Sequence, residues 1–278
     1  MTITTLDGMF NALANNSSKL VIDKASIANA AAGQFHSLWR ATGQPGQGAI
    51  PTAAAVCNSA LLGGFQYTQQ TAPATSYIGY LEAVCSNSSV TLELHDRLIH
   101  CGGLVGNVAT AQKAGVGLDG VTADNMAERI GDVNFSDVQW FLEWYTDTGA
   151  TVATATVNVT YNDGTTGNLT GVSLAATRRA SFMQPLNGLI PGADSGKFIR
   201  AVNTVTLSVS TGTAGNFGVT ATRPRASLLC PVANLKWSAD WAALPVSEVP
   251  NESCLFLVQI AGTTSTGTVR GGGKIAHG

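Results

Sequence analysis

Hydrophobic and polar residues alternate with a period of two over most of the chain after residue 75. The runs 76–86 and 89–99 show this alternation and are separated by two small polar residues. Successive side chains on a strand point to opposite faces, so the pattern predicts strands with one face in a core. The segment 101–132 is glycine-rich and mixed, and we expect a loop there with one helical turn at 123–130.

The segment 138–176 has the clearest strand pattern. Two sets of large residues alternate in its first part: Trp140, Leu142 and Trp144, and Phe141, Glu143 and Tyr145. This aromatic enrichment favours a strand over the alternative, a helix at 136–145 with Ser136 as its cap. The triplet Asn162-Asp163-Gly164 then predicts a hairpin, because Asn and Gly adopt positive φ readily.

Two later pairs of strand-like runs predict further hairpins. The runs 198–210 and 217–223 are joined by a glycine-rich turn, and 254–262 and 266–278 form the last pair. In the first of these runs, one face would carry Val205, Leu207 and Val209. About eight short strands joined by Gly, Asn and Asp turns predict a mainly β fold, an antiparallel β-sandwich of jelly-roll-like type.

The first 75 residues differ from the rest. Leu6, Met9, Phe10 and Leu13 have helical spacing, and Asp23 is a suitable cap for an alanine-rich helix that ends near residue 43. We therefore expect an N-terminal arm with short helices at 1–75 and a β-sandwich domain at 76–278. Such an arm could lie on a neighbouring subunit, and deletion of residues 1–50 would then leave the sandwich folded.

The composition indicates an uncharged surface. Charged residues make up 12% of the chain, against about 25% in ordinary soluble domains. A surface of Ser, Thr, Asn, Gln and Gly is easily desolvated, which suits a protein that works in an assembly. The net charge of -2 and the absence of a basic stripe argue against a direct nucleic-acid partner. We expect no membrane span and no Sec signal peptide, and hence synthesis and folding in a cytoplasm.

The chain has 5 cysteines and no CxxC motif: Cys57, Cys85, Cys101, Cys230 and Cys254. An odd number at scattered positions indicates buried free thiols in a reducing compartment. Whether any two of them form a disulfide remains open at this stage.

The run from His95 to Cys101 is the strongest candidate for metal chemistry. It places two imidazoles, a carboxylate and a thiol close together in the sequence. On a strand, however, His95 and His100 point to opposite faces, and on a helix their spacing is also poor for one ion. We therefore expect a structural role, in which Asp96 pairs with Arg97 or with a turn amide.

The sequence contains several fragments of enzyme-like patterns, none of them complete. Gly171–Ala175 resembles a nucleophile elbow but lacks its second glycine and follows a hairpin. Cys101 has only His100 as a sequence neighbour that could act as a base. The candidates for a glycosidase carboxylate pair are Glu82, Glu93, Asp96 and Glu143, and those for a sugar-stacking platform are Trp140, Trp144 and Tyr145. We expect no catalytic, cofactor-binding or metal-binding residues, and so no enzyme.

Four blocks resemble structural proteins of tailed bacteriophages and related prophage head modules. They are residues 92–112, 138–151, 203–224 and 264–278. The resemblance implies a virion protein without cofactors that is assembled in the host cytoplasm. Its preferred role is a head decoration, or cement, protein that binds the phage major capsid protein, stabilises the capsid lattice and acts as a homo-oligomer.

Three other functions remain open. The chain could be a major capsid protein, although that fold usually has a long spine helix and more charge. It could be a tail-tube protein, in which hairpins pair between subunits. It could also be a carbohydrate-binding or receptor-recognition β-sandwich module.

Overall fold

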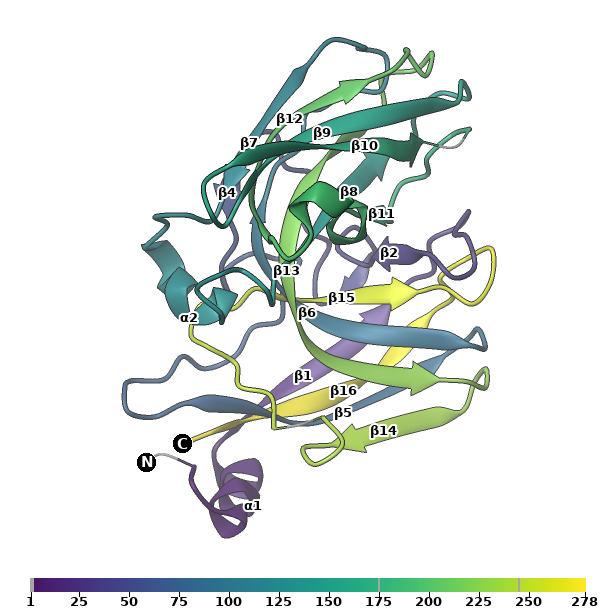
Figure 1. The fold of residues 1–278 in the computed structure, drawn as a ribbon. Coiled ribbons are helices and arrows are strands. Elements are labelled where there is room, and N and C mark those ends of the chain that lie inside the picture. The colour runs from purple at the N-terminus through teal and green to yellow at the C-terminus, as the bar shows by residue number, and fades with distance from the viewer. Residues whose placement is uncertain (1–2, 175, 245) are drawn as a thin grey trace. The chain divides into compact units, whose positions relative to one another are not determined.

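The computed structural model describes residues 3–174, 176–244 and 246–278. The chain folds into two compact units, each made of discontinuous segments (Figure 1). The terminal unit consists of residues 1–49, 58–96 and 224–278, and the inserted unit of residues 50–57 and 97–223. The predicted boundary at residue 75 coincides with neither division. The mainly β, antiparallel character of the chain is confirmed in both units.

The terminal unit contains a five-stranded antiparallel sheet in the order β14-β5-β16-β1-β3. Its strands are β1 (Ser17–Lys24), β3 (Gly43–Gln44), β5 (Ser76–Cys85), β14 (Lys236–Asp240) and β16 (Val269–His277). A second layer pairs β15 (Leu255–Ile260) with β2 (Phe35–Ser37) and with the first part of β6 (Val90–His100). Buried side chains of both layers, such as Leu20 and Leu257, form one hydrophobic cluster, so this unit is a two-layer sandwich.

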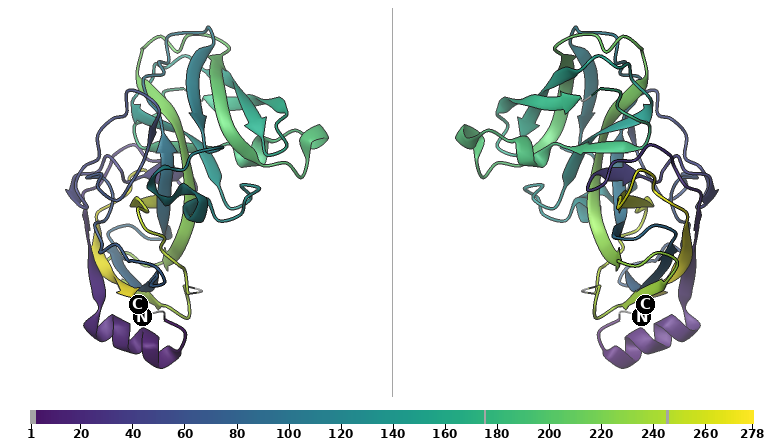
Figure 2. Two further views of the ribbon diagram at one scale, coloured as in Figure 1. Left: turned by 90° about the vertical axis from the view of Figure 1, so that its left-hand side faces the viewer. Right: turned by 90° about the vertical axis from the view of Figure 1, so that its right-hand side faces the viewer.

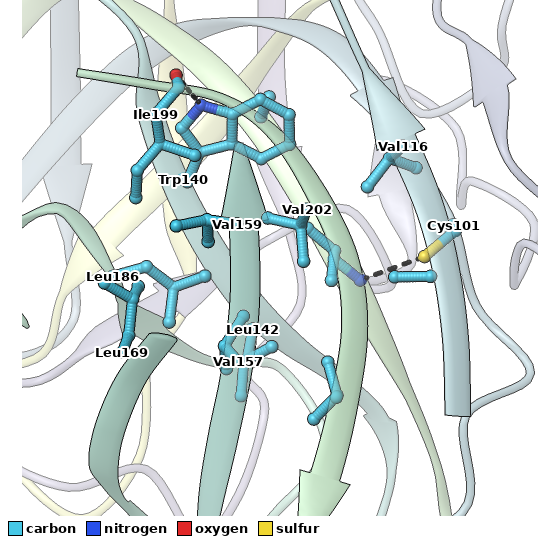
Figure 3. Close-up of a cluster of buried hydrophobic side chains, with 14 of the residues drawn as sticks. Cys101, Val116, Trp140, Leu142, Val157, Val159, Leu169, Leu186, Ile199 and Val202 are labelled. Carbon is cyan, nitrogen blue, oxygen red and sulfur yellow. Dashed lines mark hydrogen bonds between the residues drawn. The ribbon is translucent and has the colours of Figure 1, made fainter. Parts of the chain in front are cut away.

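The inserted unit also has two layers. A four-stranded sheet has the order β10-β9-β12-β7, with β7 (Gln112–Gly117), β9 (Ala153–Tyr161), β10 (Thr166–Leu174) and β12 (Ile199–Leu207). In the other layer β8 (Gln139–Thr146) lies between β11 (Phe182–Pro185) and the first part of β13 (Asn216–Cys230). The short β4 (Ala55–Val56) pairs with the end of β6. Figure 3 shows side chains of the core between the layers, among them Leu142 of β8 and Val157 of β9.

Strand β8 confirms the strand interpretation of the aromatic segment and excludes the helix alternative. Six consecutive residues from Trp140 to Tyr145 are buried, so both faces of this strand are covered. A strand buried on both faces has no polar side, which explains why aromatic residues occupy both parities.

The hairpin at residues 162–164 is confirmed. Strands β9 and β10 are antiparallel neighbours, and Thr160 lies opposite Thr166. Gly164 has φ +86, a conformation that glycine adopts without strain. The Tyr161 amide donates to the Thr165 carbonyl at 2.8 Å, which closes the turn.

The predicted hairpin between 198–210 and 217–223 is wrong, although both strands exist. Strand β12 pairs with β7 and β9, whereas β13 pairs with β8 in the other layer. The connecting loop crosses between layers and is held by Thr211, whose hydroxyl accepts from the Gly149 amide at 3.1 Å. The expected apolar face is also incomplete, because Val205 and Leu207 are buried while Val209 is exposed.

The predicted last pair, 254–262 with 266–278, is wrong for the same reason. Strand β15 pairs with β2 and β6, and β16 pairs with β1 and β5. Consecutive strands therefore lie in different layers of the terminal unit. Sequential strands in a sandwich often change layer, because each layer needs neighbours that close its own hydrogen-bond ladder.

The first helix is confirmed as α1 (Leu6–Asn15), and the Thr5 hydroxyl accepts from the Gly8 amide at 3.1 Å at its N-terminus. Met9 and Ala12 pack against Ala276 of β16, beside which the helix lies in Figure 2. The predicted alanine-rich helix after Asp23 is wrong. That segment contains the short strand β2 and irregular backbone, since its Ala and Gly residues are fixed by neighbours rather than by helix propensity.

Residues 1–49 are an integral part of the terminal unit, which argues against the expectation that deletion of residues 1–50 leaves the sandwich folded. Strand β1 lies between β16 and β3 in the five-stranded sheet. Its residues Leu20 and Ile22 are buried in the core of this unit. Removing β1 would expose this core and open the ladder of β16.

The segment 101–132 contains the predicted helical turn, as a 3₁₀ turn (Ala123–Asn125) followed by α2 (Met126–Ile130). It also contains β7, which the sequence analysis did not predict. Further 3₁₀ turns lie at Asn187–Leu189 and Gly192–Asp194. Among the described residues, no helix has both the length and the apolar character required to cross a bilayer.

Candidate functional site

The run from His95 to Cys101 does not gather its side chains around one point. His95 Nε2 and Glu93 Oε2 lie 2.8 Å apart in the terminal unit. His100, in the inserted unit, accepts at Nδ1 from Arg97 Nε at 2.9 Å. Burial, together with the Arg97 charge, lowers the pKa of His100 to about 3. In the part of the chain that the structure describes, no three His, Cys, Asp or Glu side chains are placed to hold a metal ion.

Asp96 has a different partner from the arginine we expected. Its carboxylate accepts from Arg225 Nη2 at 3.3 Å rather than from its neighbour Arg97. It also accepts from the backbone amide of Cys254, the residue before β15, at 2.9 Å. All of these groups belong to the terminal unit, where Asp96 joins β6 to the start of β15.

Arg97 is the centre of a buried polar network in the inserted unit. Its Nη2 donates to Glu143 Oε2 at 2.6 Å, to Tyr145 Oη at 2.9 Å and to Thr220 Oγ1 at 3.1 Å. These residues come from β6, β8 and β13, so one guanidinium joins three strands. Burial and the nearby Glu143 charge raise the pKa of Tyr145 well above its usual range. The geometry stabilises strand pairing and presents no reactive group to solvent.

A second buried arginine supports this network and was missed by the sequence analysis. Arg129 of α2 donates from Nη1 to the Cys57 carbonyl at 2.7 Å and from Nη2 to the Arg97 carbonyl at 2.9 Å. An arginine in a short amphipathic turn is normally solvated, so nothing in the sequence indicated that it would be buried. It satisfies backbone carbonyls where the chain enters the inserted unit.

The four carboxylates considered for glycoside hydrolysis are each held by a partner. Glu82 pairs with Lys236 at 2.6 Å, and Glu93 with His95. Asp96 and Glu143 pair with Arg225 and Arg97. A glycosidase requires two carboxyl groups facing a shared cleft, whereas these contacts tie each group to a lysine, histidine or arginine of its own unit.

The aromatic residues of β8 form part of the core rather than a sugar-binding platform. Trp140, Trp144 and Tyr145 are all buried. The Trp140 indole Nε1 donates to the Ile199 carbonyl at 2.8 Å (Figure 3). Trp144 stacks on Phe217 with 5.6 Å between ring centroids. Their faces are covered by protein and cannot stack on a sugar.

The sequence Gly171–Leu174 does not form a nucleophile elbow. Ser173 lies within β10, next to a register shift between Leu169 and Val172. Its carbonyl accepts from Arg178 Nη2 at 2.6 Å. Ala175, the last residue of the motif, lies outside the described residues. A nucleophile elbow requires a sharp turn from a strand into a helix, whereas Ser173 lies in regular strand.

All 5 cysteines are buried free thiols. Cys101 Sγ accepts from the Val219 amide at 3.3 Å, and burial raises its pKa to about 11. Such a thiol is not a nucleophile at neutral pH.

An open groove with a volume of about 570 Å³ lies on the terminal unit. We call it the β1 groove. It is lined by Lys19, Val21, Gln44, Pro45, Gly46, Ala60, Leu62, Gly64, Phe65 and Gln66. Lys19 is the one ionisable residue among these. Leu62 is 75% exposed and Val21 47% exposed, so the groove presents apolar side chains to solvent.

The β1 groove borders an open stretch of strand edge. The His277 amide donates to the Asn16 carbonyl, which identifies this pair as a hydrogen-bonded pair of the antiparallel ladder. By alternation, the backbone groups of Lys19 and Val21 point away from β16. Strand β3 pairs with β1 only at Asp23 and Lys24, so Lys19 and Val21 lie beyond the described ladder on that side.

One end of the β1 groove is held by a buried lysine. Lys24 Nζ donates to the Pro45 carbonyl at 2.6 Å and to the Ala41 carbonyl at 3.1 Å. Burial lowers the pKa of Lys24 to about 8. The ammonium group therefore fixes the loop 41–46 against the edge of β1.

Comparisons with known proteins give little further information. No protein-family model matches the sequence, and neither does any curated protein. Among solved structures, the chain is similar to the VP2 subviral particle of infectious bursal disease virus, at 10% identity and a TM-score of 0.21, over 94% of this chain and 80% of that one. A T13 particle of the same virus gives 10% identity and a TM-score of 0.17, over 95% and 78%. Both are viral capsid structures, but at these TM-scores the likeness carries no argument.

Proposed function

We propose that this chain is a structural protein of a tailed-phage virion that binds and stabilises the capsid lattice as a decoration, or cement, protein. Its partner is the phage major capsid protein, and it acts as a homo-oligomer. The observation that carries the proposal is the β1 groove, an apolar surface with a single lysine beside an open strand edge.

The groove has the features of a protein-binding surface. Exposed apolar side chains gain free energy when a partner covers them, at about 25 cal/mol for each Å². An open strand edge can add main-chain hydrogen bonds to an extended partner segment. Because an oligomer contacts several lattice sites at once, modest individual contacts are sufficient for stable attachment.

The candidate enzymatic groups support the same proposal indirectly. The imidazoles, carboxylates and indoles that could have carried chemistry are buried or paired within their own unit. They cross-link strands within each of the two sandwiches. A lattice-stabilising protein gains from rigid units, since it then transmits load between capsid subunits.

The location of this chain in particles tests the proposal. Cryo-EM of virions that contain the chain should show it on the outside of a complete capsid lattice, with particles that lack it retaining the lattice. Density for this chain in the lattice itself would establish the major capsid alternative. Density in the tail would establish the tail-tube alternative, and either result would overturn the decoration role.

The role of the β1 groove can be tested separately. The variant Leu62→Asp places a charge in the groove without touching the core, and we expect at least a tenfold loss of occupancy on particles, equivalent to about 1.4 kcal/mol. Val152→Asp is the matched control, since Val152 is 64% exposed and lies in the inserted unit. Equal occupancy of the two variants would exclude the groove as the attachment surface.

The carbohydrate-binding alternative is not favoured by the aromatic residues that suggested it, because they are buried. A glycan array would still test it directly. If variants with substitutions at Trp140 and Trp144 still bind glycans, the glycan-binding surface does not include these tryptophans.

A further inference from the structure

Cys85 and Cys230 are neighbours in the core of the terminal unit. They are the last residues of β5 and β13, and both side chains are fully buried in the same hydrophobic cluster. A side-chain interaction between the two thiols is the main cause of the pKa shift of each, which places the two side chains close together. Two cysteines at neighbouring strand ends of one core can form a disulfide without rearrangement of distant structure.

Backbone contacts hold the two strand ends together. The Asn234 amide donates to the Cys85 carbonyl at 2.7 Å, and the Ser89 amide donates to the Pro231 carbonyl at 3.1 Å. The segments that leave β5 and β13 are therefore joined by two backbone hydrogen bonds next to the two cysteines. Because β5 belongs to the five-stranded sheet and β13 pairs with β6 in the second layer, the pair lies between the layers.

The environment gives the two thiols different reactivities. The side-chain interaction with Cys230, together with burial, raises the pKa of Cys85. The same interaction lowers the pKa of Cys230. The thiolate is the nucleophile in thiol–disulfide exchange, so Cys230 is the attacking group and Cys85 the resolving group.

We propose that Cys85 and Cys230 are an oxidation site that forms a disulfide between the two layers of the terminal unit, with a small disulfide such as glutathione disulfide as oxidant. The Cys230 thiolate attacks one sulfur of glutathione disulfide, and one glutathione thiolate leaves. That thiolate takes the proton of Cys85, whose sulfur then attacks Cys230 and displaces the second glutathione. Two cysteines are oxidised to one disulfide, and glutathione disulfide is reduced to two thiols.

The oxidant reaches the pair through the strand ends. Leu229 and Val232, which flank Cys230 and Pro231 in the sequence, are exposed, although Cys230 itself is buried. Strand ends open locally at much lower cost than the whole unit. The pair therefore reacts slowly in the folded protein, without global unfolding.

Two of the other cysteines make different contacts and serve as internal controls. Cys101 Sγ accepts from the Val219 amide, and Cys57 Sγ donates to the Ala55 carbonyl at 3.9 Å. Both lie in the inserted unit. We expect them to remain thiols under the same treatment.

Peptide mapping of the folded full-length chain tests this proposal. Reduced protein is incubated with glutathione disulfide at pH 8, alkylated and digested with trypsin and a glutamate-specific protease. We expect one disulfide that joins peptides 83–93 and 226–236, while Cys57 and Cys101 are alkylated. Because the bridge closes a very long loop, we expect the melting temperature to rise by about 5 °C or more.

Variants separate this bridge from other effects of oxidation. Cys230→Ser should abolish both the linked peptides and the shift in melting temperature, whereas Cys57→Ser, the matched control, should retain both. Alkylation of Cys85 and Cys230 after oxidation of the native chain would overturn the proposal. A bridge that forms only in urea, or that involves a different pair, would also overturn it. None of these results depends on the proposed virion function.

Discussion

The two units have the same two-layer architecture but stabilise it differently. The inserted unit encloses an ionic network, in which Arg97 joins Glu143, Tyr145 and Thr220 from neighbouring strands. The terminal unit has a buried ion pair, Asp96 with Arg225. It also has a buried lysine that binds backbone carbonyls and a pair of thiols between its layers. Similar strand patterns in the sequence thus lead to cores of different chemistry.

The difference shows what buried charge contributes to a sandwich. An ion pair in a core gains little net stability over apolar residues, because desolvation offsets the attraction. Removal of one partner of the pair, however, leaves the other charge buried without a counter-ion. The network therefore acts chiefly against alternative pairings of β6, β8 and β13, which would separate Arg97 from Glu143. In the terminal unit the buried pair of Asp96 with Arg225 acts in this way only between β6 and β13.

The largest expected effect is on the inserted unit. Glu143→Ala leaves the buried Arg97 guanidinium without its carboxylate, and we expect a loss of about 3–5 kcal/mol in the free energy of unfolding. Urea denaturation followed by tryptophan fluorescence measures it, since Trp140 and Trp144 lie on the same strand as Glu143. Glu82→Ala removes a half-exposed carboxylate of the terminal unit and serves as control, with an expected change below about 1 kcal/mol. Similar losses in both variants would contradict the assigned role of the network.

An intermediate effect concerns acid stability. Burial lowers the pKa of His100 in the inserted unit to about 3 and that of His36 in the terminal unit to about 4, from 6.5. Below pH 6.5 the unfolded chain binds protons that the folded chain does not, so stability is complete above pH 6.5 and falls as the pH decreases. Each histidine contributes a slope of about 1.4 kcal/mol for each pH unit in its window.

The two histidines can be separated by substitution. His100→Gln and His36→Gln should each flatten the acid limb of the stability curve for their own unit, as measured by urea denaturation between pH 4 and 7. An unchanged slope in His100→Gln would show that this imidazole is protonated in the folded state.

The smallest effect is expected at the surface of the inserted unit. Arg179 pairs with Asp147 at 2.7 Å, and both side chains are more than 40% exposed. Arg179→Ala should change the free energy of unfolding by less than about 1 kcal/mol, with the residual effect lost in high salt. If Arg179→Ala lowers the free energy of unfolding as much as Glu143→Ala does, the contribution of these ion pairs to stability does not depend on their exposure to solvent.

The existence of most strands could be predicted from the sequence, but their partners could not. Alternation located β5, β6, β9 and β12 because it reflects one covered face, a local property. The pairing of β12 with β7 and β9 depends on the layer to which each strand belongs, which is not a local property. Because β12 and β13 are adjacent in the sequence, they were wrongly predicted to pair with each other. Only the Asn162–Gly164 turn had chemistry strong enough to fix a pairing locally.

The candidate site was predicted less well than the fold. Glu143 and Arg97 were noted by residue type, yet their contact depends on the pairing of β8 with β13 and was not visible. The β1 groove combines residues from β1, the loop after β3 and the segment 60–66, which no local pattern connects. The incorrect helix after Asp23 had the same origin, since alanine content there reflects close packing rather than helix formation.

The lysine that holds the loop 41–46 links the β1 groove to proton concentration. Two of the residues that line the groove, Pro45 and Gly46, present carbonyls to Lys24 Nζ. A molecule that binds only when the loop 41–46 is held in place binds the protein with protonated Lys24 more tightly. By thermodynamic reciprocity, its binding must raise the pKa of Lys24. Attachment through the groove should therefore weaken in mildly alkaline solution and release protons as the complex separates.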